Sequence, residues 1–169
     1  MANEVYTRSN QALFFARMAI DAWADAIESD AVNALSLVRY HREHALFHLY
    51  RGVLAVTHEV ADRYRWPLMD ARTVEQVLTT QVAERFPGPE LAELTELAQT
   101  SDNWLGRMLA GWQQLHMPPK PEDSKLQDPS LIASSAVKTD REWSLEDARE
   151  AHAALSERLN CYREGMLEW

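Results

Sequence analysis

Residues 31–64, AVNALSLVRYHREHALFHLYRGVLAVTHEVADRY, are the stretch that decides the fold of this chain. The stretch contains no proline, and its apolar residues recur every three or four positions, as on one face of an α-helix. The sequence therefore predicts a single helix about 50 Å long. A glycine inside a helix costs about 1 kcal/mol relative to alanine, so we expect a close helix crossing or a bend at Gly52. The apolar face comprises Leu35, Val38, Ala45, Leu46, Leu49, Val53, Val56 and Val60.

Helical periodicity continues on both sides of this long element. The pattern predicts a largely apolar helix over residues 9–27 and another over residues 70–85, which Pro87 ends. A further helix begins near Glu90, and residues 100–102 either continue it or break it into two. A last helix begins after Ser144. We therefore predict an all-α fold, an antiparallel bundle of four to five helices with one long central helix.

Residues 116–143 form a long irregular loop before the last helix. Prolines 118, 119 and 121 favour extended backbone there and prevent a helix. We expect this loop to be less stable than the bundle and to be cut first by a protease, between Lys120 and Lys138. The side chains expected to pack it over the bundle are Leu131, Ile132 and Trp143.

The composition is that of an acidic chain with an ordinary apolar content. Of 169 residues, 46% are hydrophobic and 25% are charged, and the net charge is −9. Nucleic acid is therefore an unfavourable partner, because phosphate backbones bind basic surfaces. The sequence has no apolar run long enough for a membrane span and no signal-peptide pattern. The one cysteine, Cys161, is interpreted as a packing residue, and a single cysteine suits the reducing cytoplasm. The length fits one domain, so we expect a single cytoplasmic domain over residues 1–169.

Three histidines form the clearest local cluster with chemical capacity. His41, His44 and His48 fall within an arc of about 60° on the long predicted helix. Two of them could bind a metal together with His152 of the last helix, since bundles build metal sites from facing helices. No carboxylate accompanies them at Glu-x-x-His spacing, so we expect neither a tight metal site nor a cofactor. The alternative is a stripe of solvated imidazoles that destabilises the bundle slightly in mild acid.

Arg42 projects onto the apolar face of the same helix, between Val38 and Leu49. A buried guanidinium needs a partner, because an unpaired buried charge costs several kcal/mol. Asp21 and Asp25 are the nearest acidic candidates by topology. We expect a structural ion pair with one of them, and the alternative is a contact with an anion or a substrate.

Aromatic residues supply the remaining candidates for a binding site. Trp104, Trp112 and Trp143 lie near the two ends of the irregular loop. They either close the ends of the bundle or line a pocket beneath the loop. Phe14 lies near the polar strip of the first helix, where it is a candidate contact with a partner.

Three Arg-to-His pairs at a spacing of five to seven residues are similar to the motif of HEPN-type helical ribonucleases. They are Arg39 with His44, Arg42 with His48, and Arg51 with His58. The resemblance implies a histidine acting as general base next to a scissile phosphate, with residues from two subunits. The acidic composition weighs against an RNA substrate. The sequence contains no phosphate-binding glycine loop, nucleophile elbow or zinc-protease motif.

Two stretches, NEVYTRSNQ at residues 3–11 and EHALFHLY at residues 43–50, carry a further resemblance. Over most of its length the chain resembles a small uncharacterised all-helical family of pseudomonad-type bacteria. That resemblance implies a stand-alone helical protein and supplies no activity. The hypothesis that best fits the sequence is a binding or interaction module that acts as a homo-oligomer or with a protein partner. The alternatives are a metal-dependent helical-bundle enzyme and a HEPN-like ribonuclease.

Overall fold

The computed structural model describes residues 2–118 and 141–167, and in these residues it contains helices and no strand. The all-α prediction is confirmed. The seven helices of the described residues are α1 (Ala2–Ile27), α2 (Ala34–Tyr64), α3 (Val74–Val77), α4 (Thr80–Arg85), α5 (Pro89–Gln99), α6 (Trp104–Leu115) and α7 (Leu145–Leu167). Within the same residues no helix combines the length and the apolar character needed to cross a lipid bilayer.

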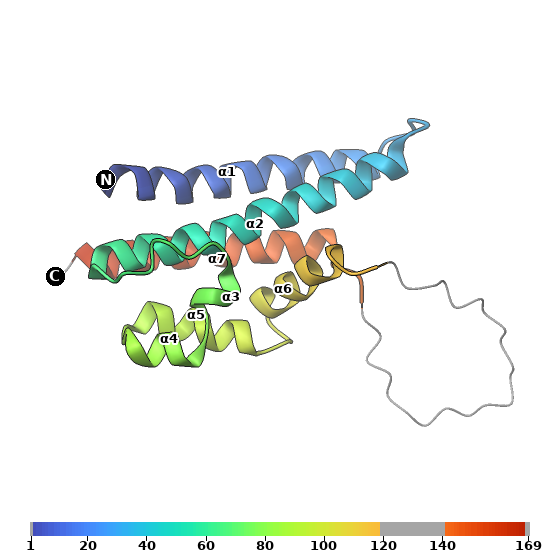
Figure 1. Cartoon of the computed structure of the whole chain (residues 1–169). Helices are drawn as coiled ribbons and strands as arrows, with labels where there is room; N and C mark the ends of the chain where they lie inside the picture. The colour runs from blue at the N-terminus through green and yellow to red at the C-terminus, as the bar shows by residue number, and fades with distance from the viewer. Residues whose placement is uncertain (1, 119–140, 168–169) are drawn as a thin grey trace, which may run out of the picture.

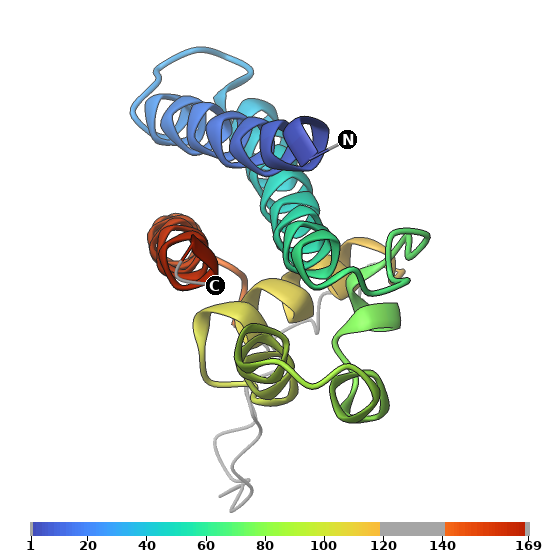
Figure 2. The same ribbon diagram turned by 90° about the vertical axis from the view of Figure 1, so that its left-hand side faces the viewer.

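The long helices α1 and α2 form an antiparallel hairpin, and the other helices cover one side of it (Figure 1). Helix α7 runs in the same direction as α2, and the short helices α3 to α6 pack beneath. Viewed along the helix axes, α1, α2 and α7 occupy three separate corners, with α5 and α6 closing the remaining side (Figure 2). Helix α2 packs against α1, α3, α5, α6 and α7, so it is the central element that residues 31–64 predict.

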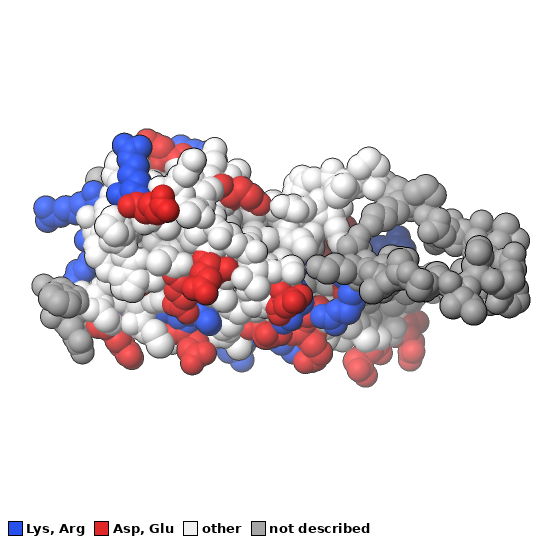
Figure 3. Space-filling model, turned by 90° about the horizontal axis from the view of Figure 1, so that it is seen from below, with Lys and Arg blue, Asp and Glu red and all other residues white. Residues whose placement is uncertain are grey.

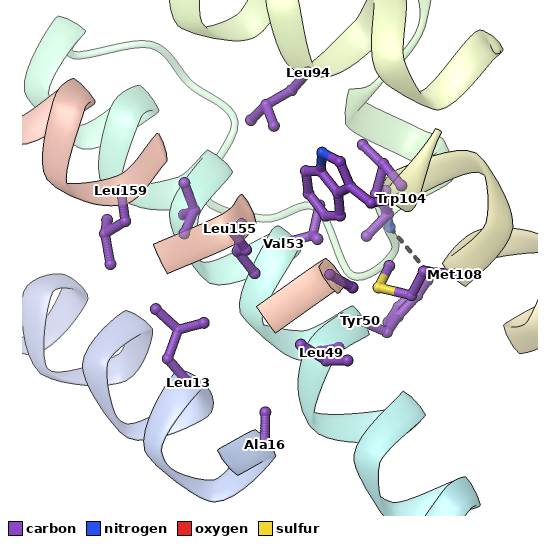
Figure 4. Packing of buried hydrophobic residues seen from close by; sticks show 14 of the residues in the cluster. Leu13, Ala16, Leu49, Tyr50, Val53, Leu94, Trp104, Met108, Leu155 and Leu159 are labelled. Carbon is purple, nitrogen blue, oxygen red and sulfur yellow. Dashed lines mark hydrogen bonds between the residues drawn. The ribbon is translucent and has the colours of Figure 1, made fainter. Parts of the chain in front are cut away.

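The core surrounds α2, where buried side chains of α1, α5, α6 and α7 meet those of α2 (Figure 4). Leu49 and Val53 of α2 are fully buried, as are Met108 of α6 and Leu155 of α7. A side chain at Gly52 would place its Cβ 3.1 Å from Cδ2 of Leu155. Helices α2 and α7 therefore cross closely at Gly52. This confirms the first of the two alternatives predicted for this glycine, a close crossing or a bend.

Two predicted helices are each divided by a side chain that caps a new helix. Thr79 accepts a hydrogen bond from the backbone N–H of Val82, so α4 begins afresh after α3. Asn103 accepts from the N–H groups of Leu105 and Gly106, which starts α6. These caps satisfy helix-end amides that a continuous helix would have bonded internally. Residues 100–102 therefore break the predicted helix into two, which was one of the two alternatives. As a result, the described residues contain more helices than the four to five expected.

The first helix begins at Ala2, seven residues before the predicted start at Ser9. Trp143 is buried, and its ring stacks on that of Trp23 at a centroid distance of 5.8 Å. Its predicted packing against the bundle is therefore confirmed. The expectations for Leu131 and Ile132, and for cleavage between Lys120 and Lys138, lie outside the described residues.

Candidate functional site

The predicted histidine stripe is present on α2, but its three members differ in environment. His44 is exposed, His41 is half-buried, and His48 is only 7% exposed. The Nε2 atoms of His44 and His48 lie 3.0 Å apart. Burial lowers the pKa of His48 to about 4, with smaller contributions from His44 and Arg51. The expectation of solvated imidazoles therefore does not hold for His48.

Aromatic rings continue from these histidines onto α1 and along α2. The ring of Phe15 lies 5.3 Å from that of His48, and Phe15 in turn lies 6.1 Å from Phe14. On α2 itself, the ring of Phe47 lies 5.1 Å from that of His48, and the ring of Tyr40 lies 5.5 Å from that of His44. We call this surface the aromatic–histidine face, and it comprises Phe14, Phe15, Met18, Tyr40, His44, Phe47 and His48.

Large apolar side chains of the aromatic–histidine face are exposed to an unusual degree. Phe14 is 61% exposed and Phe47 is 47% exposed, and Met18 and Tyr40 fall between them. Ten large hydrophobic side chains of the described residues are exposed, and seven of these lie between residues 14 and 47. Seen from below, acidic and basic side chains gather along one long edge of the molecule, whereas the other long edge carries fewer (Figure 3). Contiguous apolar surface of this kind marks interaction sites on soluble proteins.

The tip of the α1–α2 hairpin extends past α6 and α7 (Figure 1). No residue from Ile27 to His44 is buried in the structure. Farther along the hairpin the two helices have α7 and α6 beneath them, and Leu46 and Leu49 are almost completely buried. The tip is therefore a layer of two helices that lacks the third layer found in the rest of the fold.

Arg42 pairs with Glu142, and its side chain is 20% exposed. The predicted partners Asp21 and Asp25 are both exposed on α1, and Asp21 lies 4.0 Å from Arg17 instead. The choice of partner in the sequence-based prediction was therefore wrong. Because α1 packs on a different side of α2, the carboxylate that reaches Arg42 comes from the segment leading into α7.

Of the remaining sequence candidates, only Trp112 adjoins the aromatic–histidine face in the described residues, with its ring 6.4 Å from that of Phe47. Trp104 is buried under Arg158, whereas Trp112 is half-buried and stacks on Tyr50 at 4.3 Å. His152 forms a hydrogen bond through Nε2 with the carbonyl of Leu13. Among the described residues, no group of three His, Cys, Asp or Glu side chains could hold a metal ion. His152 is thus not a third ligand for the pair on α2.

Two of the three Arg–His pairs that resemble the HEPN motif are engaged elsewhere in the structure. Arg51 donates a hydrogen bond to the Gln11 side chain, and His58 is buried with its Nε2 bonded to the Ala71 carbonyl. Arg42 is engaged by Glu142, on a different side of α2 from His48. In this structure, neither His58 nor Arg42 is free to meet a phosphate.

Sequence reasoning missed a polar cluster at the opposite end of the hairpin. Arg163 of α7 donates two hydrogen bonds to Glu59, from Nε at 2.6 Å and from Nη2 at 2.9 Å. Ser9 is fully buried and donates to the same carboxylate. Arg163 also lies over the ring of Tyr6, 3.9 Å from its centroid. A cavity of about 440 Å³ adjoins the cluster.

A signal for this cluster was present in the sequence. Glu59 follows Ala55 by four residues and Val56 by three, which places a carboxylate among the residues that face α1. A carboxylate in that position requires a cation from another helix. Since Ser9 is inaccessible and both oxygens of Glu59 are bonded, the cluster joins α1, α2 and α7 and presents no free nucleophile.

The free energy of unfolding should decrease as the pH is lowered below about 6.5, the ordinary pKa of histidine. Burial lowers the pKa of His48, His58 and His152, so between pH 6.5 and the folded pKa the unfolded chain binds more protons. Each such histidine then removes up to about 1.4 kcal/mol per pH unit. Denaturant unfolding at several pH values measures this slope.

His58→Gln isolates one contribution to that slope. His58 faces Arg8 and Arg72, both of which disfavour its charged form, and it bonds the carbonyl of Ala71. The variant should show a shallower loss of stability between pH 6.5 and 5 than the parent. The same slope in both proteins would contradict this assignment.

Comparison with known proteins gives one match. The model of a family described as a family of unknown function, DUF6586, matches residues 1–169. No curated protein and no solved structure matches the chain. The family match covers the whole chain but supplies no activity, so a function has to be argued from the side chains themselves.

Proposed function

The chain belongs to the DUF6586 family, and we propose that it is an interaction module that pairs with a second copy of itself through the aromatic–histidine face. The observation that carries the proposal is the row of exposed rings that crosses from α1 to α2. Burying a large apolar side chain is worth about 1.5–3 kcal/mol, so several such side chains supply a substantial driving force for association.

Charge favours a second copy as the occupant of this face. The chain carries a net charge of −9, so most approaches of one copy to another are opposed by like-charge repulsion. The charged side chains one helical turn from the face are of both signs, namely Arg17, Asp21, Glu43 and Arg51. Two copies that meet there therefore do not bring together surfaces of a single sign.

The shape of the hairpin supports the same occupant. At its tip α1 and α2 form a two-helix layer, and exposed Ile27, Val32 and Leu35 extend the apolar surface beyond the face. Two such hairpins packed against each other give a four-helix arrangement, which is a common stable solution for amphipathic helices. A two-fold contact also uses the same surface twice, as most homodimers do.

We further place this module, as a single domain over residues 1–169, in the bacterial cytoplasm. The single cysteine, Cys161, is exposed and unpaired in the structure, which suits a reducing compartment. The family match over the whole chain supports one domain. Fractionation of cells that express the tagged chain tests the location.

The experiment that tests pairing compares two substitutions to aspartate at exposed positions. Phe47→Asp puts a carboxylate into the proposed contact, whereas Ala153→Asp adds the same charge on the outer surface of α7. In size-exclusion chromatography with light scattering, the parent and Ala153→Asp should show twice the single-chain mass of 19.4 kDa. Phe47→Asp should show the mass of one chain, because burying an unpaired carboxylate costs several kcal/mol.

Both variants should retain the helical circular dichroism spectrum of the parent, since each site is exposed. The proposal fails if the parent is monomeric at high concentration. The proposal also fails if both Phe47→Asp and Ala153→Asp remain dimeric, because the contact between the two copies would then lie outside the aromatic–histidine face.

A further inference from the structure

We propose that His44 and His48 form a two-imidazole chelate for a divalent transition-metal ion, and that the paired copies together build a four-nitrogen site from two such chelates. This inference rests on the pairing proposed above. It assigns the class of ligand to the aromatic–histidine face and makes pairing tighter when a metal ion is bound.

The two Nε2 atoms lie close enough together to serve as neighbouring ligands of one ion. They lie 3.0 Å apart on successive turns of α2. With metal–nitrogen bonds of about 2.0–2.1 Å, that separation corresponds to an angle of about 91–97° at the ion. An angle near 90° is that of a tetragonal or octahedral site, which imidazole ligands form with Cu²⁺ and Ni²⁺. The contact is a hydrogen bond, so one of the two Nε2 atoms carries a proton in the metal-free chain. When the ion binds, that proton has to move to Nδ1, because only the Nδ1–H tautomer has a free electron pair on Nε2.

The part of one chain that the structure describes supplies only these two ligands. His41 precedes His44 by three residues, but its ring packs on Tyr40 at 5.0 Å. Glu43 projects about 100° away from His44 around the helix. Within residues 2–118 and 141–167, no third His, Cys, Asp or Glu completes a metal-binding group. The remaining positions around the ion must therefore be filled from outside the described residues.

A second copy fills them with the same chemistry. The histidine pair lies within the surface proposed to pair, and a two-fold axis near His44 brings the partner's equivalent pair to the same ion. The site then holds four imidazole nitrogens. Rings of Phe15 and Phe47 lie next to His48, where they reduce access of competing water.

Charge shapes the affinity of this site. The positive charge of Arg51 acts on His48, and it opposes a bound dication. In the opposite direction, each copy carries a net charge of −9, so a dication between two copies reduces their mutual repulsion. The metal should therefore strengthen pairing more than it stabilises either chain alone.

Copper titration of the full chain tests the inference, with Cys161→Ser as the background because a thiolate reduces Cu²⁺. Sedimentation equilibrium should show the dissociation constant for pairing falling at least tenfold, with one Cu²⁺ bound per two chains. Electron paramagnetic resonance should show four equatorial nitrogens. His44→Ala should abolish both effects, whereas His116→Ala, which removes another exposed histidine, should leave both unchanged.

Different results separate this inference from the pairing itself. Pairs that form in chelator and ignore copper keep the proposed function and overturn the metal site. One Cu²⁺ per chain with two nitrogens overturns the shared site, and copper binding that survives His44→Ala places the ion elsewhere. Chains that remain monomeric with and without copper overturn both proposals.

Discussion

Replacing Arg163 by alanine should lower the free energy of unfolding by about 3–5 kcal/mol. The Glu59 side chain is 12% exposed and that of Arg163 is 18% exposed, so the substitution leaves a largely buried carboxylate without its cation. Ser9 would also lose the hydrogen bond that it accepts from Nη2. Urea unfolding followed by circular dichroism measures the loss.

Arg149→Ala is the matched control, because Arg149 pairs with Glu146 on the exposed surface of the same helix. Exposed pairs of this kind contribute less than about 1 kcal/mol. The interpretation of the Glu59 cluster as the polar connection between three helices is wrong if both alanine variants lose the same small amount.

Replacing Gly106 by alanine should cost at least about 3 kcal/mol, at the upper end of what an oversized side chain costs in a packed interior. A Cβ there would overlap the carbonyl oxygen of Thr100 and approach the carbonyl carbon to 2.9 Å and Cα of Ser101 to 3.0 Å. All three are backbone atoms, which cannot move aside by rotating a side chain. The turn between α5 and α6 would have to open, and with it the cap formed by Asn103.

Gly165→Ala in α7 is the matched control, because a Cβ at this position meets no atom within 4 Å. Alanine in a helix is favoured over glycine by about 0.5–1 kcal/mol, so this variant should be slightly more stable than the parent. Melting temperatures of the two variants give the comparison. A Gly106→Ala protein that melts within a degree of the parent would show that the turn is not held closed.

Periodicity along a single helix was enough to predict much of the fold. The spacing of apolar residues in 31–64 identified the central helix, and the cost of Gly52 correctly indicated a close crossing. Helix boundaries were harder, because Thr79 and Asn103 are ordinary polar residues until their side chains are seen to cap. Whether such a residue caps a helix depends on the local backbone, which periodicity does not describe.

The candidate site was predictable only within one helix. Spacing placed His41, His44 and His48 on one stripe, and the structure keeps that stripe. The burial of His48 depends on Phe15, which belongs to α1, and no pattern in α2 reports it. The partner of Arg42 was wrong for the same reason, since a helical projection does not tell which neighbouring element faces a given side chain.

Isotope-filtered NMR on mixed samples tests the central claim most directly, namely that two copies meet through the aromatic–histidine face. One copy carries ¹³C-labelled methionine methyl groups, and the other is unlabelled. The account predicts nuclear Overhauser effects from the Met18 methyl group to aromatic protons of the unlabelled copy, and none from Met166, which is buried at the far end of the hairpin. Effects that begin at Met166, or no effect between copies at millimolar concentration, would contradict the account.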